Sequence, residues 1–328
     1  MKREGDSHKI RKIIWSIDPF EGTTKIQKKA AETIRSLLRL KDISVGIEPV
    51  YVVPPNYATS AEFYYSPEFD VEGQALLALK QRLKNVTIPD LQLPRVLGEP
   101  SATTTGAVKV LIDYAVQSHA DLIVVGTHAR HGVSRLFLGS FAEALILHSP
   151  VPVLTVSAVT KPIRKIDNIL FPTDFGEESK LVFPRVLELA KELRAKITIL
   201  HAIFKPMRAS GSRWVSLRKE YMLQEKETGQ RQAQYYLDLA QESGVVARTE
   251  TIVSSDAVSE VVERYTARHE FQLITMASRS GKFSSALTGS VTRQVVRGSR
   301  LPVWILREKT LRLAIERGEI GRRRVAAA

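Results

Sequence analysis

Short apolar segments alternate with longer amphipathic segments along most of the chain. The short segments lack a polar residue at every second position, which predicts strands buried on both faces of a sheet. The longer segments repeat apolar residues at helical spacing, which predicts helices with one buried face. The predicted strands are 13–17, 45–53, 93–97, 121–125, 151–156, 169–173, 197–203, 247–253, 273–276 and 303–306.

Predicted helices separate most of these strands. Such alternation favours an α/β fold in which parallel strands are covered by helices on both faces, a doubly wound, Rossmann-like arrangement. The predicted helices are 25–40, 72–83, 106–118, one that begins at 139–140, 181–193, 216–243, 258–269 and 290–297.

The order of segments occurs twice, at a distance of roughly 150 residues, which indicates an internal repeat. Residues 12–18 and 167–174 are both apolar segments that end in aspartate, and 121–156 matches 272–306. A chain of 328 residues also exceeds the usual size of a single core. We therefore expect module one at 1–158, module two at 159–309 and a basic tail at 310–328.

The loop after strand 121–125 has the composition of an anion site. It contains glycine, small and basic residues and leads into a helix that begins at Gly139 and Ser140. Glycines allow backbone N–H groups to approach phosphate oxygens, and the start of a helix adds unpaired donors and a partial positive charge. The repeat brings a similar loop to 277–290 in module two.

On these residues the chain resembles the universal stress protein family in its tandem form. The nucleotide-binding branch of that family carries Gly-x2-Gly-x9-Gly-Ser/Thr and an aspartate at the end of its first strand. Asp18, Gly126, Gly139 and Ser140 fall on matching positions, while Ala129 replaces the second glycine. The resemblance implies two five-stranded parallel sheets of the adenine nucleotide alpha hydrolase-like type.

The resemblance also implies roles in binding ATP, with or without Mg²⁺. Asp18 would accept a hydrogen bond from the ribose or adenine, and Val52 would lie beside the adenine. The amides around Gly126, Thr127, Gly139 and Ser140 would hold the phosphates. As alternatives, Asp18 caps the following helix, and Gly139 and Ser140 only form a helix start.

Two departures from the pattern bear on affinity. In a left-handed conformation Ala129 would cost about 1–2 kcal/mol, so the substitution weakens binding rather than abolishing it. Basic side chains at 128, 130, 131 and 135 could recover part of that loss. Module two departs further, because its equivalents of the site are Asp174, Ala277, Ser280, Gly289 and Ser290.

Composition excludes several classes of site. The absence of cysteine removes disulfides and thiolate chemistry, and with no signal peptide or long apolar run we expect a cytoplasmic protein without membrane contact. The net charge of +13 is interpreted as a solvated basic surface rather than a nucleic-acid site. We read the tail as frayed, although Leu311, Leu313 and Ile315 could form a short helix against the body.

No catalytic or metal motif emerges. The chain has neither a nucleophile elbow nor a Gly-x4-Gly-Lys-Ser/Thr loop, so at most slow ATP hydrolysis is expected. His128 and His131 have metal-like spacing but no nearby carboxylate, and zinc is not expected. His148 and His201 are interpreted as packed or backbone-bonded.

The function hypothesis follows from the resemblance. We expect strands 151–156 and 303–306 to meet, so that the modules form an intramolecular pseudo-dimer, which could associate further into homo-oligomers. The leading hypothesis is a stress-response regulator that binds an adenine nucleotide in module one and presents a changed surface to a protein partner. The alternatives are a nucleotide-independent interaction or chaperone-like protein that uses residues 57–65 and, third, a slow ATPase.

Overall fold

The computed structural model describes residues 10–20, 24–38, 44–53, 70–99, 103–127, 138–205, 212–278, 290–310 and 313. For 212–219, 221, 222 and 290 it describes the backbone alone.

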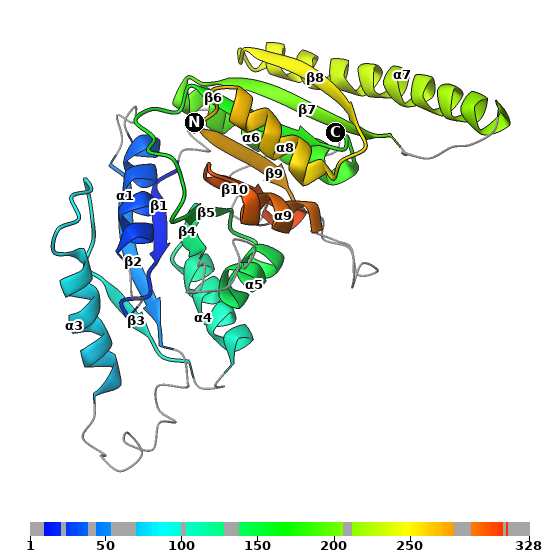
Figure 1. Cartoon of the computed structure of the whole chain (residues 1–328). Helices are drawn as coiled ribbons and strands as arrows, with labels where there is room; N and C mark the ends of the chain where they lie inside the picture. Colours follow the sequence, from blue (N-terminus) through cyan, green and yellow to red (C-terminus); the bar gives the residue numbers. More distant parts are fainter. Residues whose placement is uncertain are drawn as a thin grey trace.

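The described strands form one continuous sheet of ten strands in the order β3-β2-β1-β4-β5-β10-β9-β6-β7-β8 (Figure 1). All neighbours are parallel except β5 and β10. The α/β class and the parallel sheet within each module are thus confirmed. The strands are β1 (Lys12–Ser16), β2 (Gly46–Val52), β3 (Arg95–Leu97), β4 (Leu122–Thr127), β5 (Val153–Ser157), β6 (Asn168–Thr173), β7 (Lys196–Phe204), β8 (Ala247–Ser254), β9 (Leu273–Ala277) and β10 (Val303–Leu306).

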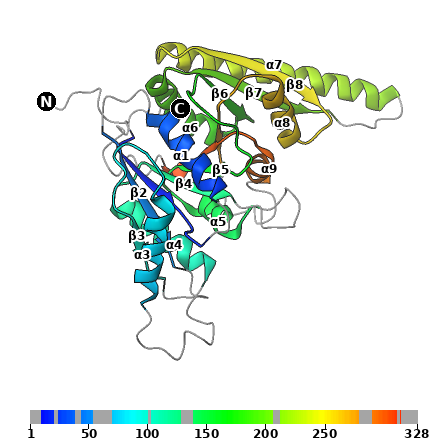
Figure 2. The same cartoon turned by 60° about the vertical axis from the view of Figure 1, so that its left-hand side comes forward.

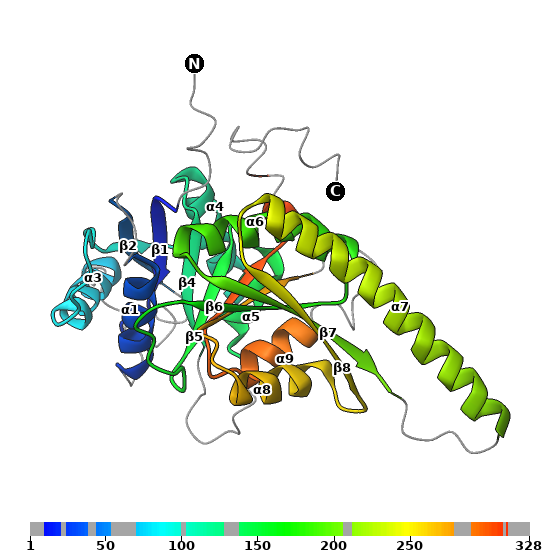
Figure 3. The same cartoon turned by 90° about the horizontal axis from the view of Figure 1, so that it is seen from above.

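Helices cover both faces of this sheet. Successive residues of a strand point to opposite faces, so Ile13 and Trp15 enter one apolar cluster while Ile14 enters the other. The first face carries α1 (Lys25–Leu38), α3 (Val71–Leu83), α6 (Glu177–Leu193) and α7 (Ser212–Glu242). The second carries α4 (Thr104–Gln117), α5 (Ser140–His148), α8 (Val258–Arg268) and α9 (Ser290–Gly298). Figure 3 shows α7 running across module two and past the end of the sheet.

The two modules join through their last strands. β5 pairs antiparallel with β10, with Val153 opposite Ile305 and Thr155 opposite Val303. Leu154 and Trp304, also opposite each other, belong to one buried cluster that contains residues of both modules. Antiparallel pairing of equivalent strands is what an approximate two-fold relation requires. The predicted meeting of these strands is confirmed.

Several predicted bounds are wrong. β4 continues beyond residue 125, because Gly126 and Thr127 pair with Val156 and Ser157 of β5. α6 begins at Glu177 rather than 181 and passes through Pro184, with two glutamates in its first turn near the positive helix end.

The described residues around the start of the tail are ordered, while most of 310–328 lies outside the described residues, so the prediction for the rest of the tail stays a prediction. Residues 308–310 are helical, and Thr310 is buried and accepts a hydrogen bond from the Arg307 N–H at 3.2 Å. Leu313 packs against the cluster on the second face, as the alternative prediction of a docked segment requires.

Candidate functional site

The predicted residues of the first two strands and of β4 meet at one rim of module one. β1 lies between β2 and β4, and Ser16 is level with Val50 on one side and Val125 on the other. Asp18, Val52 and Thr127 each follow two residues later. Because the carboxyl ends of parallel strands share an edge, the structure brings these three residues together.

Asp18 closes a turn and does not cap a helix. Its Oδ1 accepts a hydrogen bond from the Phe20 N–H at 2.9 Å, whereas α1 begins only at Lys25. The alternative role of Asp18 as the cap of the following helix is therefore wrong. The carboxylate is half-buried and stands at the end of β1, where it can still face a ligand.

Val52 is more deeply buried than a residue that contacts a ligand at the rim would be. Its side chain is only 7% exposed and packs with Val125 and Leu138 in the cluster on the second face. A ligand at this rim could therefore touch only a small part of it. On the other face, Tyr51 packs edge-on against Phe20, with ring centroids 5.8 Å apart.

The start of α5 completes the described part of the rim. Gly139 is the N-cap of α5 with φ −60° and makes no side-chain cap. A Cβ placed on it would meet no atom of the described residues within 4 Å. Leu138 anchors the segment because it is buried, whereas Ser140 is exposed. The first amides of a helix have no acceptor within it and carry a partial positive charge, which suits an anion.

The rest of the predicted loop lies outside the described residues. This holds for Ala129 and for the basic residues at 128, 130, 131 and 135. The effect of Ala129 on affinity stays a prediction.

In module two the same turn occurs, but its surroundings differ. Asp174 accepts hydrogen bonds from the Gly176 N–H at 2.9 Å and from the Ser179 hydroxyl at 3.2 Å. Between them Phe175 adopts φ 57°, which is strained for a residue other than glycine. This conformation places its ring in the core, where it is 8% exposed.

The ring of Phe175 lies in an aromatic cluster at the ends of β6 and β7. Its centroid is 4.7 Å from His201 and 5.3 Å from Tyr236 of α7. The His201 Nδ1 lies 3.0 Å from the Thr173 carbonyl oxygen. A Cβ on Gly229 of α7 would lie 3.4 Å from the imidazole. The cluster and α7 therefore fill the space that corresponds to the region around Asp18 and Tyr51 in module one.

The remaining predicted residues of module two are only partly described. Ala277 ends β9 and is half-buried, and Ser290 begins the backbone of α9. Ser280 and Gly289 lie outside the described residues. His148, at the end of α5, is exposed, so its interpretation as a packed histidine is wrong. Partial burial and the charges of Arg307 and Lys309 lower the pKa of His148.

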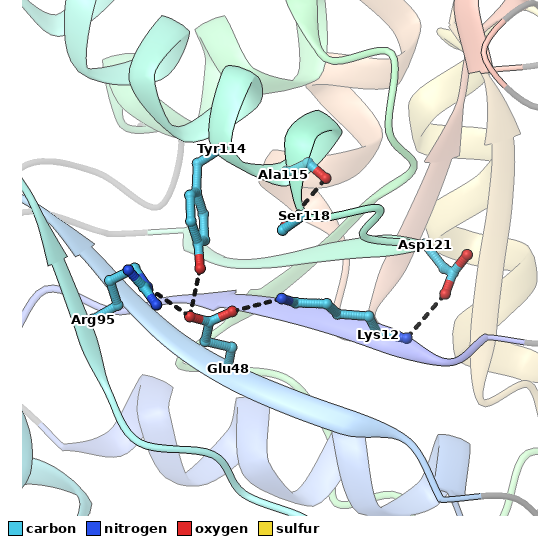
Figure 4. A network of polar contacts seen from close by, with 7 residues as sticks. All are labelled: Lys12, Glu48, Arg95, Tyr114, Ala115, Ser118 and Asp121. Carbon is cyan, nitrogen blue, oxygen red and sulfur yellow. Dashed lines mark hydrogen bonds and ion pairs between the residues drawn. The ribbon is translucent and has the colours of Figure 1, made fainter. Parts of the chain in front are cut away.

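A buried ionic network in module one was not predicted. Glu48 of β2 is 4% exposed, and its carboxylate accepts hydrogen bonds from Arg95 Nε at 2.9 Å and the Tyr114 hydroxyl at 2.5 Å (Figure 4). Lys12 Nζ lies 2.9 Å from the other carboxylate oxygen. The signal was available, since Glu48 is the single charge within an otherwise apolar predicted strand.

The network keeps Glu48 ionised. Burial by itself would raise the pKa of Glu48, but hydrogen bonds from Tyr114, Lys12 and Arg95 outweigh it and lower that pKa. Burial, together with the hydrogen bond to Glu48, raises the pKa of Tyr114 to about 12. The tyrosine therefore stays a donor at neutral pH, and the network stabilises the β1-β2-β3 edge rather than offering a reactive group.

A separate hollow of ≈ 380 Å³ lies beside residues 161–163 and the turn before β9. It is lined by Lys161, Arg268 and His269 around the apolar Ile163, Phe271 and Leu301. This hollow lies at the amino ends of β9 and β10, so it belongs to neither candidate rim. Among the described residues no three histidine, cysteine or acidic side chains gather as metal ligands. The helices of the described part include none that is long and apolar enough to cross a membrane.

Comparison with known proteins identifies the family in both halves. A model of the Universal stress protein family matches residues 9–157 and again 165–307. Universal stress protein A homolog 1 of Coxiella burnetii is 37% identical over 90 residues, 27% of this chain and 56% of that protein. Universal stress protein E of Escherichia coli is 28% identical over 161 residues, 47% of each. The chain thus spans about half the length of the curated relatives it matches.

The fold is also similar to that of a solved structure. The crystal structure of a universal stress protein from Archaeoglobus fulgidus matches with a TM-score of 0.59 and 15% identity, covering 92% of this chain and 97% of that one. The fold is therefore shared along nearly the whole of both chains. The resemblance seen in the sequence is confirmed by the two matches of the family model.

Proposed function

The chain belongs to the universal stress protein family, with one match of the family model in each half. From that premise we propose that it is a stress-response regulator that binds ATP or a related nucleotide mainly in module one. Occupancy would change the surface that the protein presents to a partner. The cytoplasm is the compartment in which we expect it to act. The division into 1–158, 159–309 and a tail from 310 belongs to the same proposal.

One observation carries the nucleotide part: Asp18, the end of β4 and the start of α5 belong to one rim. The Phe20 N–H donates to Asp18 Oδ1 and so orients the carboxylate. The other carboxylate oxygen supplies an acceptor for a ribose hydroxyl or an adenine amine. Gly139 and Ser140 supply amides at the positive end of a helix. An acceptor and an anion site at one edge suit a nucleotide, and Mg²⁺ would bind through its phosphates.

The preference for module one rests on what fills the other rim. In module two Phe175, His201 and Tyr236 pack together under α7 at the ends of β6 and β7. Asp174 still forms its turn but is exposed above this cluster. A nucleotide base would have to displace buried rings there, which costs several kcal/mol for each ring on the scale of large core substitutions, about 3–5 kcal/mol.

Calorimetric titration of the full chain with ATP and Mg²⁺ tests the proposal. We expect saturable binding by the wild type and its loss in Gly139→Val. Since a Cβ at 139 meets no atom of the described part of the chain and the φ of −60° suits any residue, valine should block the ligand and leave the fold intact. An unchanged thermal unfolding midpoint of the variant provides the control.

Absence of saturation by the wild type at millimolar ATP would overturn the nucleotide proposal. The regulator would then be a nucleotide-independent interaction protein, and Gly139→Val would leave its partner binding unchanged. The segment 57–65 that this alternative invokes lies outside the described residues.

A further inference from the structure

An ion pair connects the two helices that follow the predicted phosphate loops. Glu143 lies in the first turn of α5, and its Oε1 is 2.6 Å from Arg293 Nη1 of α9. Arg297 Nη2, one turn further along α9, lies 3.6 Å from the other carboxylate oxygen. The side chains are between 24% and 33% exposed, so solvent screens the pair only in part. Figure 2 shows α5 and α9 side by side.

Glu143 and Arg293 occupy equivalent positions of the repeat. Each stands three residues after the serine of its Gly-Ser pair, Gly139-Ser140 in module one and Gly289-Ser290 in module two. In a symmetric dimer of identical modules this position would meet its own copy, and like charges would oppose each other. The fused chain instead places opposite charges there, a pairing available only because the two modules differ.

The pair also changes the charge beside the candidate anion site. By the rise of about 1.5 Å per residue, Glu143 lies about 4.5 Å along the helix from Ser140, close enough for its charge to oppose a phosphate. Without α9 the first turn of α5 would carry one negative charge. With Arg293 and Arg297 the group of three side chains carries a net charge of +1.

We propose that module two acts as the electrostatic partner of the module one site, with Arg293 and Arg297 as positioning residues that neutralise Glu143 and favour a polyanion at the start of α5. This inference rests on the proposed function. It gives module two a role that does not depend on a nucleotide of its own.

Titration of the full chain with ATP and Mg²⁺ at low salt tests the inference through Arg293→Gln, Glu143→Gln and the double variant. We expect Arg293→Gln to weaken binding about three- to tenfold, because Glu143 is left less well compensated beside the phosphates. Glu143→Gln should bind at least as tightly as the wild type. In the double variant the loss caused by Arg293→Gln should largely disappear, and added salt should reduce the difference between Arg293→Gln and the wild type.

Arg268→Gln is the matched control, because it removes the same charge from an exposed position in the last turn of α8. Equal affinities of Arg268→Gln and Arg293→Gln would overturn the inference while nucleotide binding stands. A double variant as weak as Arg293→Gln would also overturn it, since the loss would then come from damage to the joint. No binding by the wild type would overturn the proposed function, and the inference with it.

Discussion

The two rims of the pseudo-dimer contain the same turn after the first strand, but the side chains around that turn differ. In both modules an aspartate after the first strand accepts a hydrogen bond from the amide two residues later. In module one the next aromatic residue, Phe20, is 42% exposed, whereas in module two Phe175 takes a left-handed conformation and is 8% exposed. A shared turn therefore does not imply a shared site, because the described side chains around it differ between the two modules.

The largest expected effect is on the free energy of unfolding, and it differs between the two phenylalanines. Phe175→Ala should lower the free energy of unfolding by about 3 kcal/mol, because it leaves a cavity between His201 and Tyr236. Phe20→Ala should cost less than about 1 kcal/mol, since much of that ring is already in water. Urea unfolding of both variants measures the contrast, and equal losses would contradict it.

A second prediction concerns the buried ionic network around Glu48 in module one. At the position equivalent to Glu48, module two has Thr198, which accepts a hydrogen bond from Arg248 Nε at 3.1 Å. Glu48→Gln should cost about 2 kcal/mol at neutral pH, because charged hydrogen bonds are lost while Lys12 and Arg95 can regain water.

The pH dependence of that loss has a definite sign. The folded-state pKa of Glu48 lies below its ordinary value of 4.5, so its ionic contribution is present above that value and is lost as pH falls through the folded-state pKa. The difference in unfolding free energy between wild type and Glu48→Gln should shrink over the same range. Urea unfolding followed from neutral to acid pH provides the measurement, and a difference that grows with acid would refute the assignment. Thr198→Val is the control, because it should show no such acid dependence.

A third prediction compares the two aspartates as ligand acceptors. Asp18→Asn keeps an oxygen for the Phe20 amide but removes the charge, and we expect about tenfold weaker ATP binding, which corresponds to about 1.4 kcal/mol. Asp174→Asn should leave the affinity unchanged, because buried rings fill the space beside that turn. Calorimetric titration of both variants checks this, and a larger effect at 174 would reverse the assignment of the site.

The smallest expected effect tests how closely α7 covers module two. A Cβ at Gly229 would make ordinary contacts, 3.4 Å from His201 and 4.0 Å from Phe175. Gly229→Ala should therefore stabilise the protein by about 0.5–1 kcal/mol through helix propensity alone. Gly229→Leu should destabilise it, because the larger side chain cannot enter the aromatic cluster. Thermal unfolding distinguishes the two, and a stable leucine variant would show that α7 lies farther from the rim.

The sequence by itself determined the alternation of strands and helices, the repeat and the meeting of the last two strands. The alternation and the repeat follow from periodicity and apolar content, which report how each segment is buried, whereas the meeting of the last two strands was what the family resemblance implied. The rule that parallel strands end at one edge places Asp18 and Gly126 on one rim, and the family resemblance adds Gly139 to the candidate site.

Only the tertiary structure decided which charges and rings meet. Arg293 lies 150 residues from Glu143, and Tyr236 reaches Phe175 from a helix far along the chain. Pairing with β5 determines the length of β4. The packing of α7 against His201 fills the space at the rim of module two. Local patterns encode the environment that a segment needs, but the identity of its neighbours is fixed only when distant segments pack together.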